Sequence, residues 1–368
     1  MIMHGGNLRW AREYYHLEHF IDLSANINPF GPPAGVLERL RKVLPQIVHY
    51  PDPESKALRL KLSEITGLPY EATLVGNGAG ELIYTVLQAL HPKKIMIPVP
   101  AFSEYERAAA AISSEIAYFP LGANGWKSLP ACDTPKSVQA FEKNWQALLE
   151  GINLLFVCSP HNPTGTLLPR ETFAAIVRAA YRSECMVVFD ESFYDFLPDY
   201  CRWSAREFLP EFPNLIVLYS LTKFYSLPGI RLGALFAQPE IIRMLENIRD
   251  PWAVNVLAQE AGLAALEDED FPSWVRQSLT ESRDSFYTSF KEASFKHWHL
   301  QPSEANFAII QVMKGTAAEL TELLGRRGIL VRDCSSFAGL EGEFIRVAIK
   351  DQDSMAKFIA ALKTVEAK

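Results

Sequence analysis

Residues 219–233 read YSLTKFYSLPGIRLG and follow an apolar run at residues 215–218 that predicts a buried strand. Just past this run, Lys223 lies among hydroxyl residues, and Arg231 follows eight positions later with glycines on either side of it. A lysine that attacks a carbonyl group must be partly desolvated, and a phosphate attracts hydroxyl donors and a bidentate guanidinium. The stretch therefore predicts either a nucleophilic lysine beside an anion site or an ordinary polar surface turn.

The composition is that of a soluble globular protein with one very large domain or two ordinary ones: 368 residues, 48% apolar and 21% charged. The net charge is −7 without a long basic run, so nucleic acid is not an expected partner. No apolar segment approaches the roughly 20 residues of a membrane span, and no secretion signal is visible, so we expect a cytoplasmic protein. Five scattered cysteines without a Cys-x-x-Cys pair, and eight histidines without a His-x-x-x-His pair, predict reduced thiols and no metal site.

Strand and helix patterns alternate through about residue 260, which is typical of an α/β fold with a mostly parallel sheet. Within this part, buried strands are expected at 94–99, 153–158 and 186–189. A smaller α+β unit follows, with helices expected at 273–298, 316–327 and 352–362 and strands at 306–312, 329–332 and 344–349. We divide the chain into an N-terminal segment that joins the small domain (1–45), a large domain (46–265) and a small C-terminal α+β domain (266–368).

Residues 73–83 read TLVGNGAGELI, a short apolar strand that runs into a glycine-rich turn and then into a helix expected over 81–90. Small residues let backbone amides approach an anion, and the dipole of the following helix adds to the attraction. The segment is not a Walker loop, because no Gly-Lys-Ser/Thr follows, and the third glycine is misplaced for a dinucleotide fingerprint. It predicts a phosphate cradle, although a plain strand–turn–helix also favours glycine.

Polar or aromatic side chains follow three expected strands, at the edge where open α/β sheets bind ligands. Phe102 could stack there on a flat heterocycle, although a core residue at a helix start is the commoner case. Asn162 is held by the tight turn Asn-Pro-Thr-Gly, and Asp190 needs a cationic partner to offset its desolvation. Near the N-terminus, the asparagines of the loop at 21–33 either fix neighbouring backbone or line a substrate pocket.

Five stretches occur together in one order: GNGAG at 76–80, NPTG at 162–165, DESF at 190–193, SLTK…R at 220–231 and RVAI at 346–349. Pyridoxal 5′-phosphate (PLP) chemistry uses all of these parts, since the cofactor needs a lysine, an acid at its pyridine nitrogen and a phosphate cup. The sequence resembles the class I/II aminotransferases, in particular the histidinol-phosphate aminotransferases and the L-threonine-O-3-phosphate decarboxylases of cobalamin biosynthesis. The resemblance implies PLP as cofactor and a fold-type I architecture, with a large mostly parallel-sheet PLP-binding domain and a smaller α+β domain.

The resemblance to the decarboxylases is closer. It is carried by HGGN at 4–7, SANINP at 24–29 and PWAVN at 251–255, and by Phe193 where aminotransferases usually have tyrosine. It implies a lyase that converts L-threonine O-3-phosphate into (R)-1-aminopropan-2-yl phosphate. A histidinol-phosphate or related aminotransferase, and a decarboxylase of L-serine O-phosphate, stay open as alternatives. A protein that only binds the cofactor is disfavoured, because Lys223 and Asp190 are both intact.

The resemblance also implies a role for individual residues. Lys223 would hold the cofactor covalently, Asp190 would keep the pyridine nitrogen protonated, and Asn162 would bond the phenolic oxygen and contact the substrate carboxylate. Phe102 would stack on the ring of the cofactor. The implied ligands of the cofactor phosphate are Gly78, Ala79, Gly80, Ser220, Thr222 and Arg231. Tyr50 would reach the phosphate of the cofactor in the neighbouring subunit of a homodimer. The implied substrate ligands are Arg346 for the α-carboxylate and His4, Gly5, Asn26 and Arg332 for the substrate phosphate or carboxylate. The alternative for Arg332 is a strand-end salt bridge.

Overall fold

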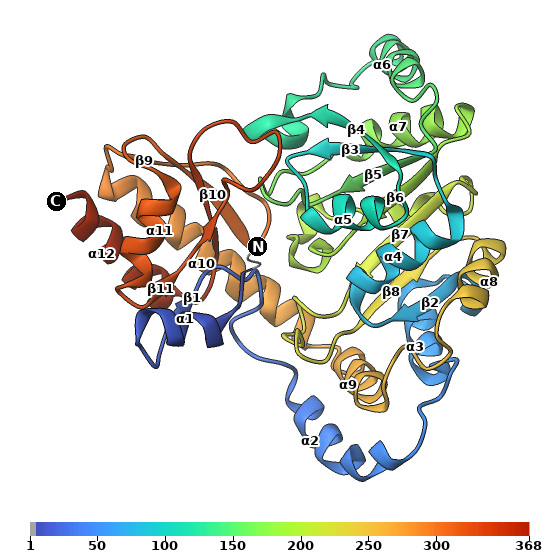
Figure 1. Ribbon diagram of the computed structural model, residues 1–368, viewed down its shortest axis with the longest axis horizontal. Coiled ribbons are helices and arrows are strands. Elements are labelled where there is room, and N and C mark those ends of the chain that lie inside the picture. The colour runs from blue at the N-terminus through green and yellow to red at the C-terminus, as the bar shows by residue number, and fades with distance from the viewer. Residues whose placement is uncertain (1–4, 368) are drawn as a thin grey trace.

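The computed structural model describes residues 5–367, and its larger part is a seven-stranded sheet with helices on both faces (Figure 1). The strand order is β2-β8-β7-β6-β5-β3-β4. The strands from β7 to β4 run parallel, whereas β8 runs antiparallel to its neighbours β7 and β2. The predicted α/β class with a mostly parallel sheet is therefore confirmed. The strands are β2 (Thr73–Gly76), β3 (Lys94–Val99), β4 (Glu115–Pro120), β5 (Leu154–Cys158), β6 (Met186–Asp190), β7 (Leu215–Ser220) and β8 (Gly233–Phe236).

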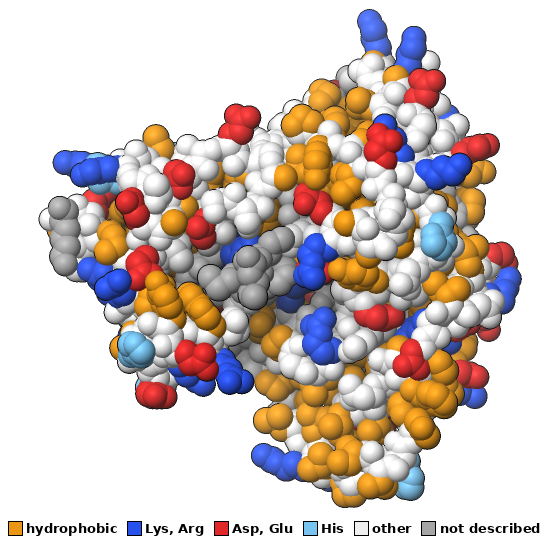
Figure 2. Space-filling model, in the orientation of Figure 1, with side chains coloured by type: hydrophobic (Ala, Val, Ile, Leu, Met, Phe, Trp, Pro, Cys, Tyr) orange, Lys and Arg blue, Asp and Glu red, His pale blue; other side chains and the backbone are white. Residues whose placement is uncertain are grey.

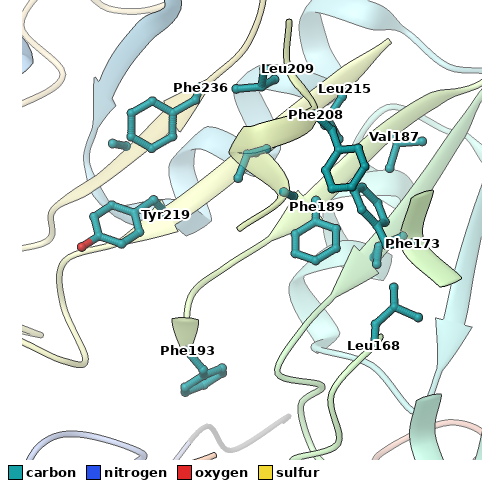
Figure 3. Packing of buried hydrophobic residues seen from close by; sticks show 14 of the residues in the cluster. Leu168, Phe173, Val187, Phe189, Phe193, Phe208, Leu209, Leu215, Tyr219 and Phe236 are labelled. Atoms are coloured by element: carbon teal, nitrogen blue, oxygen red, sulfur yellow. The ribbon is translucent and has the colours of Figure 1, made fainter. Parts of the chain in front are cut away.

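Both faces of this sheet are buried, which is why its central strands read as continuous apolar runs. Alternate residues of β7 belong to opposite cores, with Val217 in one and Leu218 in the other. One core packs against α4 (Gly78–Leu90), α5 (Ser103–Ala111) and α8 (Pro239–Ile248). The other packs against α2 (Ala34–Val43), α3 (Lys56–Thr66), α6 (Pro135–Leu148), α7 (Arg170–Arg182) and α9 (Val256–Glu267). Figure 3 shows Phe173, Phe189 and Phe208 packed together in this second core, with Phe193 set apart from them.

A second, four-stranded sheet with the order β12-β13-β10-β9 lies beside the first one (Figure 1). Its strands are β9 (Trp298–Leu300), β10 (Phe307–Val312), β12 (Arg332–Asp333) and β13 (Phe344–Ala348), and its helices are α10 (Phe271–Ala293), α11 (Ala317–Gly325) and α12 (Gln352–Glu366). The start of the described chain, with α1 (Leu8–Tyr15), joins this part, because β1 (Ile21–Asp22) pairs in parallel with β11 (Ile329–Leu330). Short 3₁₀ turns are η1 (Leu44–Val48), η2 (Tyr70–Ala72), η3 (Gly122–Ser128), η4 (Tyr194–Phe196), η5 (Asp199–Cys201) and η6 (Ala205–Phe208).

The structure differs from the sequence predictions at several element ends. The helix predicted over 273–298 ends at Ala293, because Ser294 adopts a left-handed φ of 52° before the chain enters β9. The strand predicted over 329–332 is two short strands, β11 and β12, with different partners. The boundary predicted between residues 265 and 266 falls within α9, and the division into three parts stays a prediction. Across residues 5–367, no helix combines the length and the apolar character that crossing a membrane requires.

Candidate active site

A cavity of about 230 Å³ lies at the carboxyl ends of the parallel strands, on the side that faces the four-stranded sheet. Side chains from both sheets and from the N-terminal segment line it. A second cavity of about 590 Å³ extends from it toward the first turn of α4. The residues that line both cavities are Phe102, Asp190, Ser192, Thr222, Lys223 and Arg231. This is the edge at which open α/β sheets place their ligands.

Lys223 lies in the turn after β7 and is half-buried between the buried residues Thr222 and Phe224. Its ammonium nitrogen lies 4.3 Å from the centre of the Phe193 ring. Burial lowers the pKa of Lys223 below its usual range, against the opposing charge of Asp190. A desolvated lysine of lowered pKa is the form that can act as a nucleophile. Of the two interpretations of this stretch, the nucleophilic lysine is therefore favoured over the surface turn.

Asp190 ends β6 and is 4% exposed. It lies beside Cys158, its partner in the register of β5 and β6. Its Oδ1 atom accepts a hydrogen bond from the backbone N–H of Ser192 at 2.8 Å, and its Oδ2 atom accepts one from the hydroxyl of Tyr105 at 2.6 Å. Because a carboxylate oxygen has more than one acceptor site, Asp190 can still accept a further bond from a group inside the cavity.

The predicted phosphate cradle lies where α4 begins. Gly78, Ala79 and Gly80 form the first turn of this helix, whose backbone N–H groups have no acceptor within the helix. The Arg231 guanidinium lies against Gly78, because a Cβ atom added at Gly78 would lie 2.5 Å from its Nη2 atom. Any side chain at position 78 would displace Arg231. At the end of β7, the hydroxyls of Ser220 and Thr222 lie 2.9 Å apart, so amides, hydroxyls and a guanidinium converge as a phosphate site requires.

Phe102 precedes the first turn of α5 and lines both cavities. Its ring forms a T-shaped pair with the ring of Tyr105, with ring centres 5.7 Å apart and an interplanar angle of 89°. Phe193 packs on Phe307 with ring centres 4.8 Å apart. The opposing contact of this ring is the Lys223 ammonium, which thus meets an apolar ring. A tyrosine at position 193 would add a hydroxyl there.

Arg346 on β13 and Arg332 on β12 are register partners of adjacent antiparallel strands, and both line the smaller cavity. Arg346 is 8% exposed and donates to the side-chain oxygen of Asn162 at 2.5 Å and to the carbonyl of Ser24 at 3.2 Å. Burial lowers the pKa of Arg346 to about 10. Arg332 donates to the Ser336 hydroxyl at 2.9 Å, and burial lowers its pKa as well. Within residues 5–367, the alternative of a strand-end salt bridge at Arg332 is not observed.

Both interpretations of the asparagine loop apply, each to one residue. Asn28 fixes the lysine turn, since its backbone N–H donates to the carbonyl of Lys223 at 3.0 Å and its amide donates to the carbonyl of Phe224 at 2.9 Å. Asn26 instead lines the smaller cavity, where its buried Oδ1 atom has no hydrogen-bond partner among residues 5–367. Asn26 is therefore free to bond a ligand, whereas Asn28 is a structural residue.

Most of the predicted site residues come together around these two cavities. The lining residues among them are Gly5, Asn26, Ala79, Gly80, Phe102, Asn162, Asp190, Ser220, Thr222, Lys223, Arg231, Arg332 and Arg346. Tyr50 lies elsewhere, is 79% exposed and stacks on Trp252 with ring centres 4.5 Å apart. His4 lies outside the described residues. The roles of these residues toward cofactor and substrate stay predictions.

Tyr105 and Lys350 were not among the predicted site residues, and the partners of Asn28 were not predicted either. Tyr105 follows Phe102 by three positions at the start of a helix, a spacing that places two side chains on one face. The bonds of Asn28 and Lys350 join segments about 200 or more residues apart and have no sequence signal: the Lys350 ammonium donates to the carbonyl of Ile27 at 2.6 Å, between the two asparagines of the loop.

Lys350 gives the fold a pH dependence. Burial lowers its pKa from 10.5 to about 8, against the opposing charges of Asp22 and Asp351. Between these two values the unfolded chain binds more protons than the folded one, so the contribution to stability rises with pH, and it is constant below about pH 8. We compare the free energy of unfolding of the unaltered protein with that of Lys350→Met. The difference between them is expected to change in favour of the unaltered protein by on the order of 1–3 kcal/mol as the pH is raised from 7.5 to 10.5. Urea titrations of both proteins measure the difference, and a difference that stays constant with pH would contradict the prediction.

Comparison with known proteins identifies the family. Residues 18–362 match the model of the family described as aminotransferase class I and II. A threonine-phosphate decarboxylase from Salmonella typhimurium is 33% identical over 366 residues, 98% of this chain and 96% of the relative. A histidinol-phosphate aminotransferase from Symbiobacterium thermophilum is 32% identical over 349 residues, 94% of this chain and 91% of the relative.

A solved structure has the same fold. The L-threonine-O-3-phosphate decarboxylase from Porphyromonas gingivalis superposes with a TM-score of 0.80 at 26% identity, covering 94% of this chain and 98% of that one. The lysine, the buried acid and the anion cradle described above also fit PLP, because the cradle depends on a glycine at position 78 and Asp190 retains acceptor capacity. The chain therefore belongs to the class I and II aminotransferase family, with the fold-type I architecture and PLP as its cofactor.

Proposed function

We propose that the protein decarboxylates L-threonine O-3-phosphate to (R)-1-aminopropan-2-yl phosphate and carbon dioxide, a step of cobalamin biosynthesis. The observation that carries the proposal is Phe193, which presents an apolar ring to Lys223 where the related aminotransferases usually have a tyrosine. The names of the threonine-phosphate decarboxylases that resemble this chain support it. A second candidate is histidinol-phosphate amino transfer, which is favoured by relatives of equal identity.

Arg332 and Arg346 suit a substrate with two anionic ends. Their positions are directly opposite each other on neighbouring antiparallel strands, so their side chains leave the sheet on the same face. In the proposal, Arg346 with Asn162 binds the α-carboxylate, and Arg332 with Asn26, Gly5 and His4 binds the substrate phosphate. Two anchors fix the rotation of the substrate about its Cα atom, which one anchor alone does not.

Bound PLP supplies an electron sink for the electrons of a bond that breaks at Cα. The two arginine anchors would select the reaction by setting which bond at Cα is placed to give its electrons to that sink. In the proposed reaction the bond from Cα to the carboxylate breaks, carbon dioxide leaves, and a proton takes its place at Cα. Lys223, whose pKa is lowered by burial, can hold and return that proton.

Three substrates distinguish the candidates when they are offered to the PLP-loaded protein. We expect carbon dioxide release from L-threonine O-3-phosphate and slower release from L-serine O-phosphate, by about tenfold or more, because one methyl group contributes roughly 1–3 kcal/mol of discrimination. Histidinol phosphate with 2-oxoglutarate is expected to give little glutamate. Rapid glutamate formation without carbon dioxide release from either phosphorylated amino acid would establish the aminotransferase instead.

Phe193→Tyr tests the residue that carries the proposal. The new hydroxyl would lie beside Lys223 and could donate to the phenolic oxygen of PLP, favouring its anionic form. A hydrogen bond to a charged group contributes about 1.5–3 kcal/mol, so we expect the visible band of the bound cofactor to titrate about 1–2 pH units lower. Carbon dioxide release should fall and amino transfer should rise, measured on the same samples. An unchanged ratio of the two reactions would show that position 193 does not select between them.

We also propose a homodimer in which Tyr50 completes the phosphate site of the partner subunit. Hydrophobic side chains gather at the bottom of the view in Figure 2, over α2 and the segment after it. Their exposed members are Leu37 at 51%, Leu44 at 53%, Ile47 at 58% and Val48 at 76%. An exposed apolar patch of this kind is typical of a protein interface, and Tyr50 lies next to it in sequence and outside the cavities of its own chain.

Mixing two impaired variants tests this arrangement. Tyr50→Ala is expected to lose about 10- to 100-fold in turnover, the range of a lost bond to a charged group, and Lys223→Ala to lose it almost entirely. In a mixed dimer, one of the two sites combines an intact Lys223 with an intact partner Tyr50. Co-refolding the variants should therefore restore up to about a quarter of the normal activity, since about half of the dimers are mixed. No gain on mixing, or a monomer in sedimentation equilibrium, would contradict the shared site.

A further inference from the structure

Tyr105 forms a hydrogen bond with Asp190, and none of the roles proposed above includes Tyr105. It lies in the first turn of α5, is 2% exposed and lines the smaller cavity. Its hydroxyl donates to Oδ2 of Asp190 at 2.6 Å, while Oδ1 accepts from the backbone of Ser192. The carboxylate therefore receives one donor on each oxygen before any ligand binds.

The ring of Tyr105 is fixed on both sides. It stacks on Phe156 with ring centres 4.4 Å apart and an interplanar angle of 11°, and it forms a T-shaped pair with the ring of Phe102. Phe102 is the residue expected to stack on the cofactor. Tyr105 therefore contacts both Asp190 and Phe102, the two residues predicted to hold the ring of the cofactor.

The hydroxyl of Tyr105 can act toward Asp190 only as a donor. Burial raises the pKa of Tyr105 well above its usual value, and the charge of Asp190 raises it further, so the phenol keeps its proton. A donor aimed at a carboxylate favours the ionised form over the protonated one. The ionised form is the one that accepts a hydrogen bond from a protonated ring nitrogen.

We propose that Tyr105 is a positioning residue that keeps the Asp190 carboxylate aimed at the pyridine nitrogen of PLP, and thereby keeps that nitrogen protonated. The inference rests on the cofactor, which both candidate reactions share, and not on the choice between decarboxylation and amino transfer. Its test accordingly measures the state and the affinity of the cofactor rather than turnover.

Tyr105→Phe removes the hydroxyl and keeps the ring between Phe156 and Phe102. With ¹⁵N-labelled PLP bound, we expect the pyridine nitrogen to lose its proton about one pH unit lower than in the unaltered protein. We also expect the dissociation constant of PLP to rise about tenfold. Both effects have the size of one hydrogen bond to a charged group. Tyr287→Phe is the matched control, because it removes a tyrosine hydroxyl that donates to a backbone carbonyl, that of Gln301, in the other sheet's part of the chain. The control should leave both quantities unchanged.

A cofactor analogue separates positioning from simple packing. In 1-deaza-PLP a carbon replaces the ring nitrogen, so Asp190 has nothing to bond. The tenfold loss of affinity in Tyr105→Phe should shrink to less than about threefold with this analogue, whereas a packing defect would weaken both cofactors equally.

If Tyr105→Phe does not fold, replacement of Tyr105 by 3-fluorotyrosine, a stronger donor, should raise the pH at which the ring nitrogen loses its proton. Coincident nitrogen titrations in the altered and unaltered proteins, or equal losses for PLP and its analogue, would overturn the proposal.

Discussion

Lys223→Ala is expected to lose at least about 10³-fold in turnover, because the variant loses both the covalent anchor of the cofactor and the group that handles the proton at Cα. The turn that holds Lys223 should persist, since it is fastened through backbone carbonyls by Asn28 rather than through the lysine side chain. The variant should therefore melt close to the unaltered protein while lacking the visible band of a lysine-bound cofactor. Absorbance spectra and turnover, measured after loading with PLP, check both expectations.

Lys143→Ala provides the matched control for this experiment. Lys143 lies on the exposed side of α6 and does not line either cavity, so its loss should change neither the spectrum nor the activity. If Lys223→Ala kept the visible band, another lysine would hold the cofactor. The assignment of the reactive amine would then be wrong even if the fold were right.

Arg346→Ala is the second change with a large expected effect. Losing a bidentate contact to an anion removes about 1.5–3 kcal/mol or more, and the same substitution leaves the Asn162 amide and the Ser24 carbonyl without their donor. We expect kcat/KM to fall by about 10²- to 10³-fold, with the affinity for PLP changed by less than about threefold. Steady-state kinetics and a cofactor titration measure the two quantities separately.

Arg346→Lys separates charge from geometry at this position. Lysine keeps the positive charge but lacks the planar fork, so most of the loss should remain. Recovery to near the unaltered rate would mean that position 346 needs only a charge. An equally large loss of PLP affinity in Arg346→Ala would mean that the arginine supports the cofactor rather than the substrate.

The sequence predicted those parts of the site that follow directly from a local pattern. Lys223 and Asp190 each come at the end of an apolar run, and in a parallel sheet the ends of such strands meet at one edge. The pairing of Arg332 with Arg346 was not predictable in this way, because it requires the residues at 329–332 to divide between two partner strands.

Contacts between distant segments leave no periodic signal. The hydroxyl of Tyr105 reaches Asp190 across 85 positions, and the amide of Asn28 reaches the carbonyl of Phe224 across 196. β4 was not predicted because none of its residues is buried, so it lacks the apolar run that marks the inner strands. The local pattern thus predicted where Lys223 and Asp190 lie, and tertiary packing determined what holds them.

One measurement tests the central claim most directly. The PLP-loaded protein is incubated in D₂O with L-threonine O-3-phosphate and without any 2-oxo acid, and the products are examined by NMR. The proposal predicts carbon dioxide and 1-aminopropan-2-yl phosphate with a single deuterium on the carbon that carried the carboxylate. A phosphorylated 2-oxo acid without carbon dioxide, formed in an amount equal to the cofactor, would contradict it and establish amino transfer.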